Sequence, residues 1–306
     1  MGKVLVKRDV DKTSVARGMA FAGLGGVCWG FSGACAQLLT DVYHLSIPWV
    51  ICVRLLFGAL FFLGIADLRT PERFKQVPKD RKLLGYLFAY AALGILMPQV
   101  CYLSTISYTN AGIATVMERT GLLVVLAYTC IKLHRGPKLK EIIGIALALV
   151  GVFLIATDGN IGQLAIPWEG LAFGLALALS LLFYTVLPGK PLAAWGNFVT
   201  TGLGMLIAGI IAWIVVQPWT VPVDYSPDMV FYLVLMILAG TIMSYGFFME
   251  GIKQAGSMRA GLMGCTEPVS AVLFSALWLG SVFTPPAIAG IVLIIAMMFL
   301  VRGSGE

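Results

Sequence analysis

Long apolar runs separated by short polar segments make up most of this chain. A helix that crosses the hydrocarbon core of a bilayer needs about 20 mostly apolar residues. Cutting the chain where charged residues, Pro or Asn interrupt the runs leaves ten segments of suitable length. We therefore predict an all-α polytopic membrane protein with ten transmembrane helices, over residues 17–39, 47–66, 83–105, 110–131, 139–157, 168–187, 191–216, 229–250, 257–281 and 286–302.

The composition excludes most other classes of protein. Of the 306 residues, 59% are hydrophobic and only 12% are charged, and the mean hydropathy is +0.92. A water-soluble domain of this size carries about twice that share of charge. The chain is also too apolar to be disordered, and its basic residues lie in short clusters between apolar runs, which argues against nucleic-acid binding.

The basic residues predict the orientation in the membrane. Only Arg54 and Arg119 lie deep within predicted spans. The other Lys and Arg residues lie in the N-terminal arm, in the second, fourth, sixth and eighth loops and in the tail, and the remaining loops contain none. Because cytoplasmic loops carry the excess of Lys and Arg, we expect a multi-pass inner (plasma) membrane protein with both termini in the cytoplasm. Orientation thus explains the net charge of +6 without an anionic partner. The first apolar run is too long for a cleavable signal peptide.

The chain contains an internal repeat. A shift of 146 residues superposes Met97 on Met243, Met117 on Met263 and other pairs of identical residues. We predict an arm over residues 1–16, five-helix repeats over 17–160 and 161–302, and a tail over 303–306. An odd number of spans per repeat places the second half upside down relative to the first, which is typical of transporters with a substrate site between the halves.

Three short motifs carry a resemblance to a known family. They are Cys28-Trp29-Gly30 in the first span, Thr109-Asn110-Ala111-Gly112-Ile113-Ala114 entering the fourth, and Glu267-Pro268-Val269-Ser270-Ala271 in the ninth. With the five-plus-five arrangement, these resemble the drug/metabolite transporter superfamily, and within it the bacterial branch with two EamA-type domains. The resemblance implies a cavity lined by spans one to four and six to nine, peripheral spans five and ten, and alternating access. The chain departs from many relatives in having Glu118-Arg119-Thr120-Gly121 where they carry a proline.

Four charged residues lie near the predicted bilayer midplane: Arg54, Glu118, Arg119 and Glu267. Charges within spans are costly unless they are paired or face water, so each is a functional candidate. One interpretation is a structural ion-pair network in which Arg54 pairs with Glu118 or Glu267. The other is a charge-balanced cavity that binds a zwitterion, whose carboxylate would contact Arg and whose ammonium would contact Glu.

Further polar and aromatic residues complete a predicted substrate site. A carboxyl inside the membrane can exchange a proton during transport, which makes Glu118 and Glu267 the candidates for proton coupling. Glu250, at the cytoplasmic end of span eight, is interpreted as an interfacial or gate residue. The predicted substrate-binding residues are Trp29, Arg54, Gln99, Tyr102, Glu118, Arg119, Tyr184, Tyr245, Phe248 and Glu267. The aromatic members could instead form a cage for a quaternary amine.

Other residues are assigned structural roles. Pro98 and Pro268 fall within spans and predict helix kinks beside the cavity. Trp49, Trp168, Trp195 and Trp219 lie near span ends and predict an interfacial belt. All six cysteines lie in predicted spans without metal-ligand spacing, so we expect reduced packing residues and neither a metal nor another cofactor.

The sequence predicts a secondary transporter for a small organic metabolite. An amino acid or related zwitterion is the favoured substrate and efflux the favoured direction, by family resemblance; a quaternary-amine carrier is the alternative. The protein is expected to be a monomer or a homodimer. Among other classes, Pro188-Gly189-Lys190 lacks the spacing of a phosphate-binding loop, which argues against an ATP-driven pump. A membrane-embedded enzyme lacks a recognisable catalytic constellation, and a channel lacks a selectivity filter.

Overall fold

The computed structural model of the chain describes residues 12–74, 77, 81–160 and 163–302. Its regular secondary structure over these residues is helical, without strands. Nine helical segments there are long and apolar enough to span a membrane, and a shorter apolar helix covers Pro285–Leu300. The all-α membrane class is confirmed, while the count of ten spans stays a prediction. The predicted tail and most of the predicted arm lie outside the described residues.

The helices lie close to the predicted spans, and the third, eighth and ninth spans are each divided into shorter elements. The elements are α1 (Lys12–Asp41), α2 (Ile47–Arg69), α3 (Pro71–Phe74), α4 (Arg81–Ala89), η2 (Tyr90–Leu96), α5 (Met97–Tyr108), α6 (Ala111–Lys132), α7 (Leu139–Thr157), α8 (Trp168–Val186), α9 (Gly189–Val216), η3 (Pro218–Thr220), α10 (Pro227–Ile237), η4 (Leu238–Met243), α11 (Ser244–Ala255), α12 (Ser257–Met263), α13 (Thr266–Leu277) and α14 (Pro285–Arg302).

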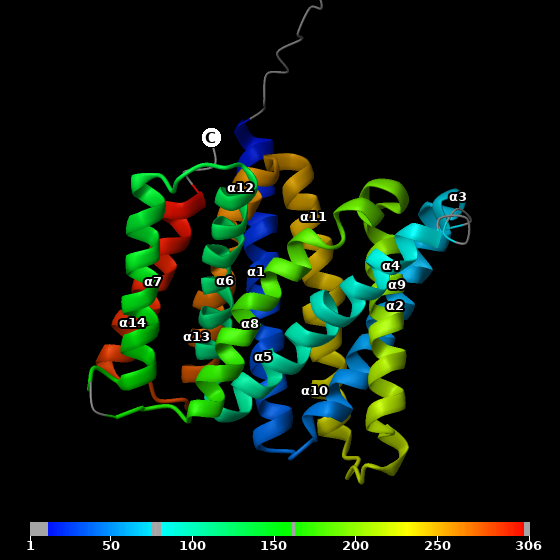
Figure 1. Ribbon diagram of the computed structural model, residues 1–306. Coiled ribbons are helices and arrows are strands. Elements are labelled where there is room, and N and C mark those ends of the chain that lie inside the picture. Colours follow the sequence, from blue (N-terminus) through cyan, green and yellow to red (C-terminus); the bar gives the residue numbers. More distant parts are fainter. Residues whose placement is uncertain (1–11, 75–76, 78–80, 161–162, 303–306) are drawn as a thin grey trace, which may run out of the picture.

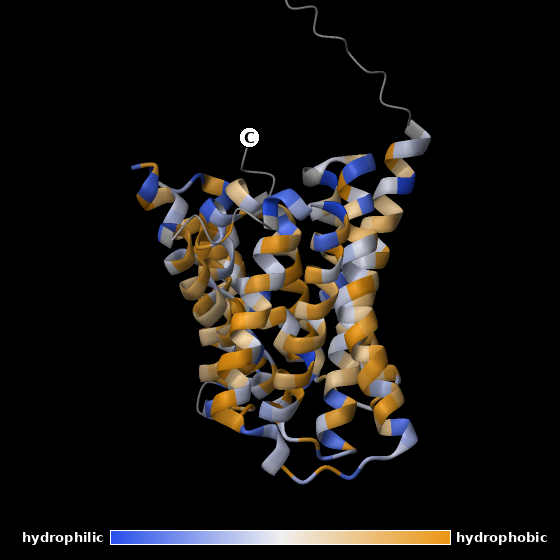
Figure 2. Cartoon of the chain, turned by 90° about the vertical axis from the view of Figure 1, so that its right-hand side faces the viewer, coloured by the Kyte–Doolittle hydropathy of each residue, from blue (hydrophilic) through white to orange (hydrophobic). Residues whose placement is uncertain are grey.

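The helices form one bundle with two distinct ends. The start of α1 and the end of α14 lie at the same end, which we call the terminal face, and the opposite end is the distal face (Figure 1). Apolar residues cover the middle of the bundle, and polar residues gather at both ends (Figure 2). Large apolar side chains such as Leu60 and Leu149 are about two-thirds exposed. An apolar belt of this kind suits a surface that faces lipid.

Helix contacts are matched between the two halves of the chain. α1 packs along α11 and α13 of the second half, and α8 packs correspondingly along α5 and α6 of the first. α2 pairs with α9, and α7 with α14. In the last pair, a Cβ added at Gly151 would lie 2.8 Å from the Gly290 carbonyl oxygen. The absence of side chains at such positions lets the two helix backbones approach closely, as membrane helices often do.

Three spans have irregular segments at the level of the cavity. Proline lacks an N–H and cannot bond to the carbonyl four residues earlier. Accordingly, π-helix η2 precedes Pro98, and span nine is interrupted at Gly264 and Cys265, just before Pro268. Both positions agree with the predicted kinks. The π-helix η4 in span eight contains no proline and was not predicted.

An Arg–Glu pair at the start of α7 fixes the loop between α6 and α7. Arg135 Nη1 and Nη2 donate to the two Glu141 carboxylate oxygens, each at 2.8 Å. Glu141 also accepts a hydrogen bond from the Lys138 N–H and so caps α7. The hydrogen bonds that Arg135 donates to Glu141 raise the pKa of Arg135. Because both partners belong to one loop and the adjacent helix, this pair stabilises local structure.

Only half of the predicted tryptophan belt lies at the surface. Trp168 and Trp219 are about two-thirds exposed, whereas Trp49 and Trp195 are buried in the core, so their belt assignment is wrong. Trp195 is buried because the helix breaks at Gly196, which has φ 78° and ψ 175°. The residues before this break form a short helical segment that packs against the bundle, and Trp195 is fully covered there.

Candidate functional site

A cavity of about 700 Å³ lies between the two halves. All ten side chains predicted to bind substrate line it: Trp29, Arg54, Gln99, Tyr102, Glu118, Arg119, Tyr184, Tyr245, Phe248 and Glu267. None of the described lining residues belongs to α7 or α14, which agrees with the peripheral role expected for spans five and ten. The substrate-binding role of these residues stays a prediction.

The cavity is not centred along the bundle. At its inner end it reaches Gly33, Arg54 and Glu118, each about two turns from the distal end of its helix. Towards the terminal face it reaches Leu192, near the start of α9, and Met249, near the middle of α11. The cavity therefore extends from near the terminal face to beyond the middle of the bundle and stops short of the distal face.

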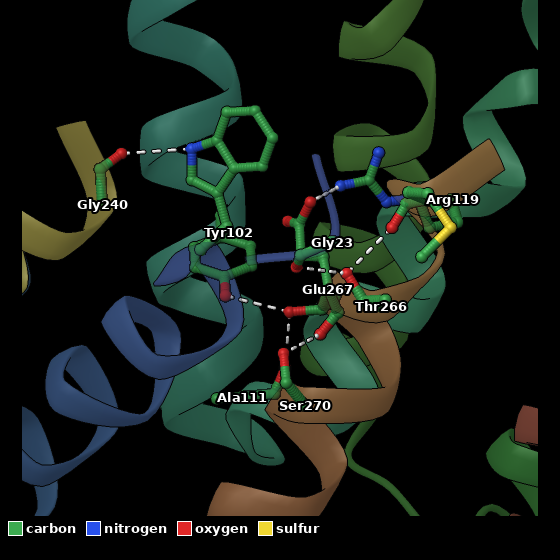
Figure 3. Close-up of polar contacts among 11 residues, drawn as sticks. Gly23, Tyr102, Ala111, Arg119, Gly240, Thr266, Glu267 and Ser270 are labelled. Atoms are coloured by element: carbon green, nitrogen blue, oxygen red, sulfur yellow. Dashed lines mark hydrogen bonds and ion pairs between the residues drawn. The ribbon is translucent and has the colours of Figure 1, made fainter. Parts of the chain in front are cut away.

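One ion pair joins the halves across the cavity wall. Arg119 of α6 donates through Nη2 to Glu267 Oε2 of α13 (Figure 3). The two side chains are 16% and 12% exposed. Glu267 also lies in the first turn of α13, where the helix dipole favours a negative charge. The sequence had suggested pairing between Arg54 and Glu118 or Glu267, and the structure places Arg119 at Glu267 instead.

The other two charges remain separate. Arg54 and Glu118 form no ion pair within 4 Å with any residue that the structure describes. Both are partly exposed and line the cavity. Among the described residues, Gln99 Oε1 and Arg119 Nε are buried without a hydrogen-bond partner. The cavity thus presents one guanidinium, one carboxylate and a buried amide oxygen that a bound molecule or water could satisfy.

Hydrogen bonds fix the orientation of several wall residues. The Trp29 indole N–H donates to the Gly240 carbonyl oxygen at 3.1 Å and so joins α1 to η4. The Tyr102 hydroxyl lies 3.0 Å from the Thr115 hydroxyl, which donates to the Ala111 carbonyl oxygen (Figure 3). These contacts hold the two aromatic rings at the cavity wall.

Aromatic rings form much of the remaining wall. Trp29 and Phe248 have centroids 5.2 Å apart, and Phe62 meets Tyr245 edge-on at 5.0 Å. Tyr90 and Tyr184 lie 6.1 Å apart. Together with the charged residues, these rings give an amphipathic lining with both ionic and apolar surfaces.

Several polar wall residues were not predicted. Ser180, Asn197, Thr201 and Thr241 also line the cavity. The Thr201 hydroxyl donates to Asn197 Oδ1 at 3.1 Å. An available signal was the polar stretch beginning with Gly196-Asn197 inside an otherwise apolar span. Because Gly196 breaks the helix, Asn197 starts the regular part of span seven beside the cavity.

Two further expectations can be compared with the structure. Glu250 accepts hydrogen bonds from Gln254 at 2.7 Å and from Lys253 at 3.4 Å. Met249, the residue before it, lines the cavity, whereas Glu250 is not among the described lining residues. Its gate role stays a prediction.

Within the described part of the chain, no three or more His, Cys, Asp or Glu side chains lie close enough together to hold a metal ion.

Comparison with known sequences assigns the family. The EamA-like transporter family matches the chain twice, over residues 16–157 and 168–303. The chain belongs to the EamA-like transporter family. The predicted resemblance is thereby confirmed, and this is a multi-pass membrane transporter.

Curated relatives and a solved structure agree with this assignment. An inner membrane transporter of Salmonella typhimurium, YicL, is 28% identical over 288 residues, covering 94% of this chain and 96% of that protein. The Bacillus subtilis transporter YcbK is 21% identical over 275 residues, covering 87% of this chain and 86% of that protein. Both carry names that describe them as uncharacterized transporters. A crystal structure at 12% identity has a TM-score of 0.61 over 94% of this chain and 96% of its own, which shows a shared fold.

Proposed function

We propose that this protein is a secondary transporter that carries a small zwitterionic metabolite, an amino acid or related compound, across the bacterial inner membrane. Transport proceeds by alternating access of the cavity to the two sides, with efflux as the favoured direction. Membership of a transporter family supports the general class. The cavity between the halves, near the middle of the spans, supports its use as the substrate site.

The observation that carries the zwitterion assignment is the pairing of the four midplane charges. Arg119 and Glu267 neutralise each other across the two halves. Arg54 and Glu118 each face the cavity without an ion-pair partner among the described residues. A guanidinium binds a carboxylate with two parallel hydrogen bonds, and a carboxylate binds an ammonium group. An amino acid would supply both opposite charges at once.

Glu118 is also the proposed proton-coupling residue. Glu267 could release or bind a proton only by changing its contact with Arg119. Glu118 can do so without breaking an ion pair to any described residue. Competition between a proton and a substrate ammonium for one carboxylate is a simple way to couple their movements.

A second candidate substrate is a quaternary amine. The three aromatic pairs in the wall, Trp29 with Phe248, Phe62 with Tyr245 and Tyr90 with Tyr184, favour this alternative. Aromatic faces attract a desolvated cation without hydrogen bonds. Binding of such a cation would depend on the rings and Glu118 and would be opposed by Arg54.

Thermal stability of the detergent-solubilised protein distinguishes these substrates. The panel contains zwitterionic amino acids, quaternary amines, organic anions and nucleosides. A ligand present at 100 times its Kd stabilises the native state by about 2.7 kcal/mol. We expect an amino acid to raise the Tm of the wild type, and Arg54→Ala to abolish this shift. Arg69→Ala, an exposed position on the same helix, is the matched control and should retain the shift.

Transport in proteoliposomes then tests the mechanism. A carrier shows saturation and counterflow of unmodified substrate, whereas a channel shows neither and an enzyme returns a changed compound. Shifts caused only by quaternary amines, and retained in Arg54→Ala, would replace the zwitterion site with the aromatic alternative. Chemical conversion of the ligand by the purified protein would contradict transport as its function.

A further inference from the structure

Buried polar groups also meet on the distal side of the cavity. We call Gln37, Ala111, Gly112, Ser275 and Ser281 the distal cluster. Gln37 Nε2 donates to Ser281 Oγ at 3.1 Å, and Gln37 Oε1 accepts from the Ala111 N–H at 3.0 Å and from Ser275 Oγ at 3.1 Å. Ser275 Oγ in turn accepts from the Gly112 N–H at 3.2 Å. Every polar atom of the Gln37 side chain is therefore engaged.

The distal cluster completes the start of α6. The first N–H groups of a helix lack partners within the helix. Here the Ala111 N–H bonds to Gln37, the Gly112 N–H to Ser275, and the Ile113 N–H to the capping residue Asn110 at 2.9 Å. Only Asn110 is local to α6, so the helix start depends on side chains from α1 and α13.

The cluster is closely packed and mostly buried, with Ser281 partly exposed at its edge. Gln37 is 5% exposed, and Ser275 is fully buried. A Cβ added at Gly112 would lie 3.0 Å from Val272 Cα, so glycine lets the start of α6 approach the α13 backbone. In such a site each lost hydrogen bond leaves a buried group unpaired, which makes separation of the helices unfavourable until water enters.

Aromatic residues cover the same contact. Phe31 of α1 stacks on Trp278 with centroids 5.6 Å apart, and meets Phe274 edge-on at 5.2 Å. Trp278 also lies 5.8 Å from Tyr232 of α10. These rings add apolar contact between the first and second halves next to the hydrogen-bonded residues.

The distal cluster joins the two halves. Gln37, Ala111 and Gly112 belong to the first family match, and Ser275 and Ser281 to the second. The repeat places Ser275 on Thr129, whose hydroxyl donates within α6 to the Val125 carbonyl oxygen at 2.8 Å. The cavity lies on the terminal-face side of the distal cluster and extends towards Leu192 near the start of α9. Towards the terminal face the halves are joined by other contacts: the Thr266 hydroxyl donates to the Gly23 carbonyl oxygen at 2.8 Å, and the exposed Lys190 Nζ donates to the Tyr86 hydroxyl at 2.7 Å.

We infer that the distal cluster is the closed outer gate of the transporter, with Gln37 as its central residue. The inference rests on the proposed alternating-access function and on the terminal face lying in the cytoplasm. The structure is then the inward-facing state, and outward opening requires Gln37 to release Ser275 and Ser281. Water that enters the opening replaces the lost bonds, so the gate separates two conformations without preventing their exchange.

Distances between spin labels on the distal face test this gate. Val42→Cys and Val282→Cys place labels on exposed residues beside the ends of α1 and α13. Serine replaces the two partly exposed native cysteines, Cys28 and Cys130. In this background we expect one main distance for wild-type Gln37. Gln37→Leu should increase the population with a longer distance about tenfold or more, since one net hydrogen bond is worth about that factor.

Matched variants separate the gate from general destabilisation. Thr40→Val changes a hydroxyl on the same helix that bonds to Ala36, Gln37 and Asp41 within α1 and its end, so it should leave the distances unchanged. Ser281→Ala removes a single gate bond and should produce a smaller shift in the direction of Gln37→Leu. It keeps the test informative if Gln37→Leu does not fold.

The outcomes distinguish the gate from the proposed function. Unchanged distances in folded Gln37→Leu or in Ser281→Ala, with counterflow still present, would overturn the gate and leave the transport function standing. Shifted distances without counterflow of any compound would support the gate as a conformational contact and count against the proposed transport of a zwitterion.

Discussion

The cavity and the distal cluster both hold polar side chains inside an apolar bundle, yet they differ in how these groups are paired. In the distal cluster, Gln37 and Ser275 bond to each other and to the start of α6. In the cavity, Arg54 and Glu118 lack an ion-pair partner among the described residues. Complete pairing is typical of a dry structural contact, while unpaired charges at a cavity favour a site completed by a ligand or water.

The comparison is tested most strongly by removing one partner of the Arg119–Glu267 pair. Arg119→Met leaves Glu267, which is 12% exposed, without its guanidinium. Breaking a buried ion pair costs about 3–5 kcal/mol. We therefore expect a large loss of thermal stability, measured by tryptophan fluorescence in detergent. Glu267→Gln added to Arg119→Met should recover much of it, because both charges are then absent.

Arg54→Met is the matched control for this prediction. It removes the same side chain from the same cavity, but no described residue loses an ion-pair partner. Its loss of stability without ligand should therefore be much smaller than that of Arg119→Met. If Arg54→Met and Arg119→Met lose equal thermal stability, the presence of an ion-pair partner does not separate a structural arginine from a substrate-binding one.

A smaller loss of stability is expected from a substitution that disturbs the close packing of α1 against α13. A Cβ added at Gly30 on α1 would lie 2.7 Å from both Ala271 N and Glu267 O, which are backbone atoms of α13. Gly30→Ala should therefore push the helices apart and lower stability by about 1–3 kcal/mol. At Gly64 on α2, no atom lies within 4 Å of the added Cβ. Gly64→Ala should leave the Tm unchanged or raise it slightly, because alanine favours helix. If Gly64→Ala lowers stability as much as Gly30→Ala does, steric contact with α13 is not the reason for the loss in Gly30→Ala.

Much of the fold was predictable because the bilayer restricts the spanning structures to continuous apolar helices. The predicted segments agree with the helices to within a few residues for most spans, and Pro98 and Pro268 marked two of the irregular segments. Charge inside an apolar run similarly identified residues of the cavity wall. Apolar run length, proline and charge within a run are local features, so they can be recognised in a single sequence.

Features that depend on neighbouring helices were not predictable. The choice of Arg119 over Arg54 as the partner of Glu267 depends on how α6 faces α13. The burial of Trp195 follows from the break at Gly196, which a lone glycine does not specify. Gln37 gave no signal as a gate residue, because its partners lie on α6 and beyond α13, far away in sequence.

The smallest expected effect distinguishes the two cavity carboxylates by their response to pH. Glu267 is held by Arg119, whereas Glu118 can exchange a proton without breaking an ion pair to a described residue. In proteoliposomes with an imposed pH gradient, we expect a few-fold acceleration of wild-type transport. Glu118→Gln should lose this acceleration, and its counterflow at equal pH should need a higher substrate concentration, because the substrate ammonium loses its carboxylate partner. Glu267→Gln, if it folds, should keep the acceleration, since its carboxylate stabilises Arg119 and does not carry the proton. Loss of the acceleration in Glu267→Gln alone would reverse the assignment, and an unchanged response in both variants would argue for transport that is not coupled to protons.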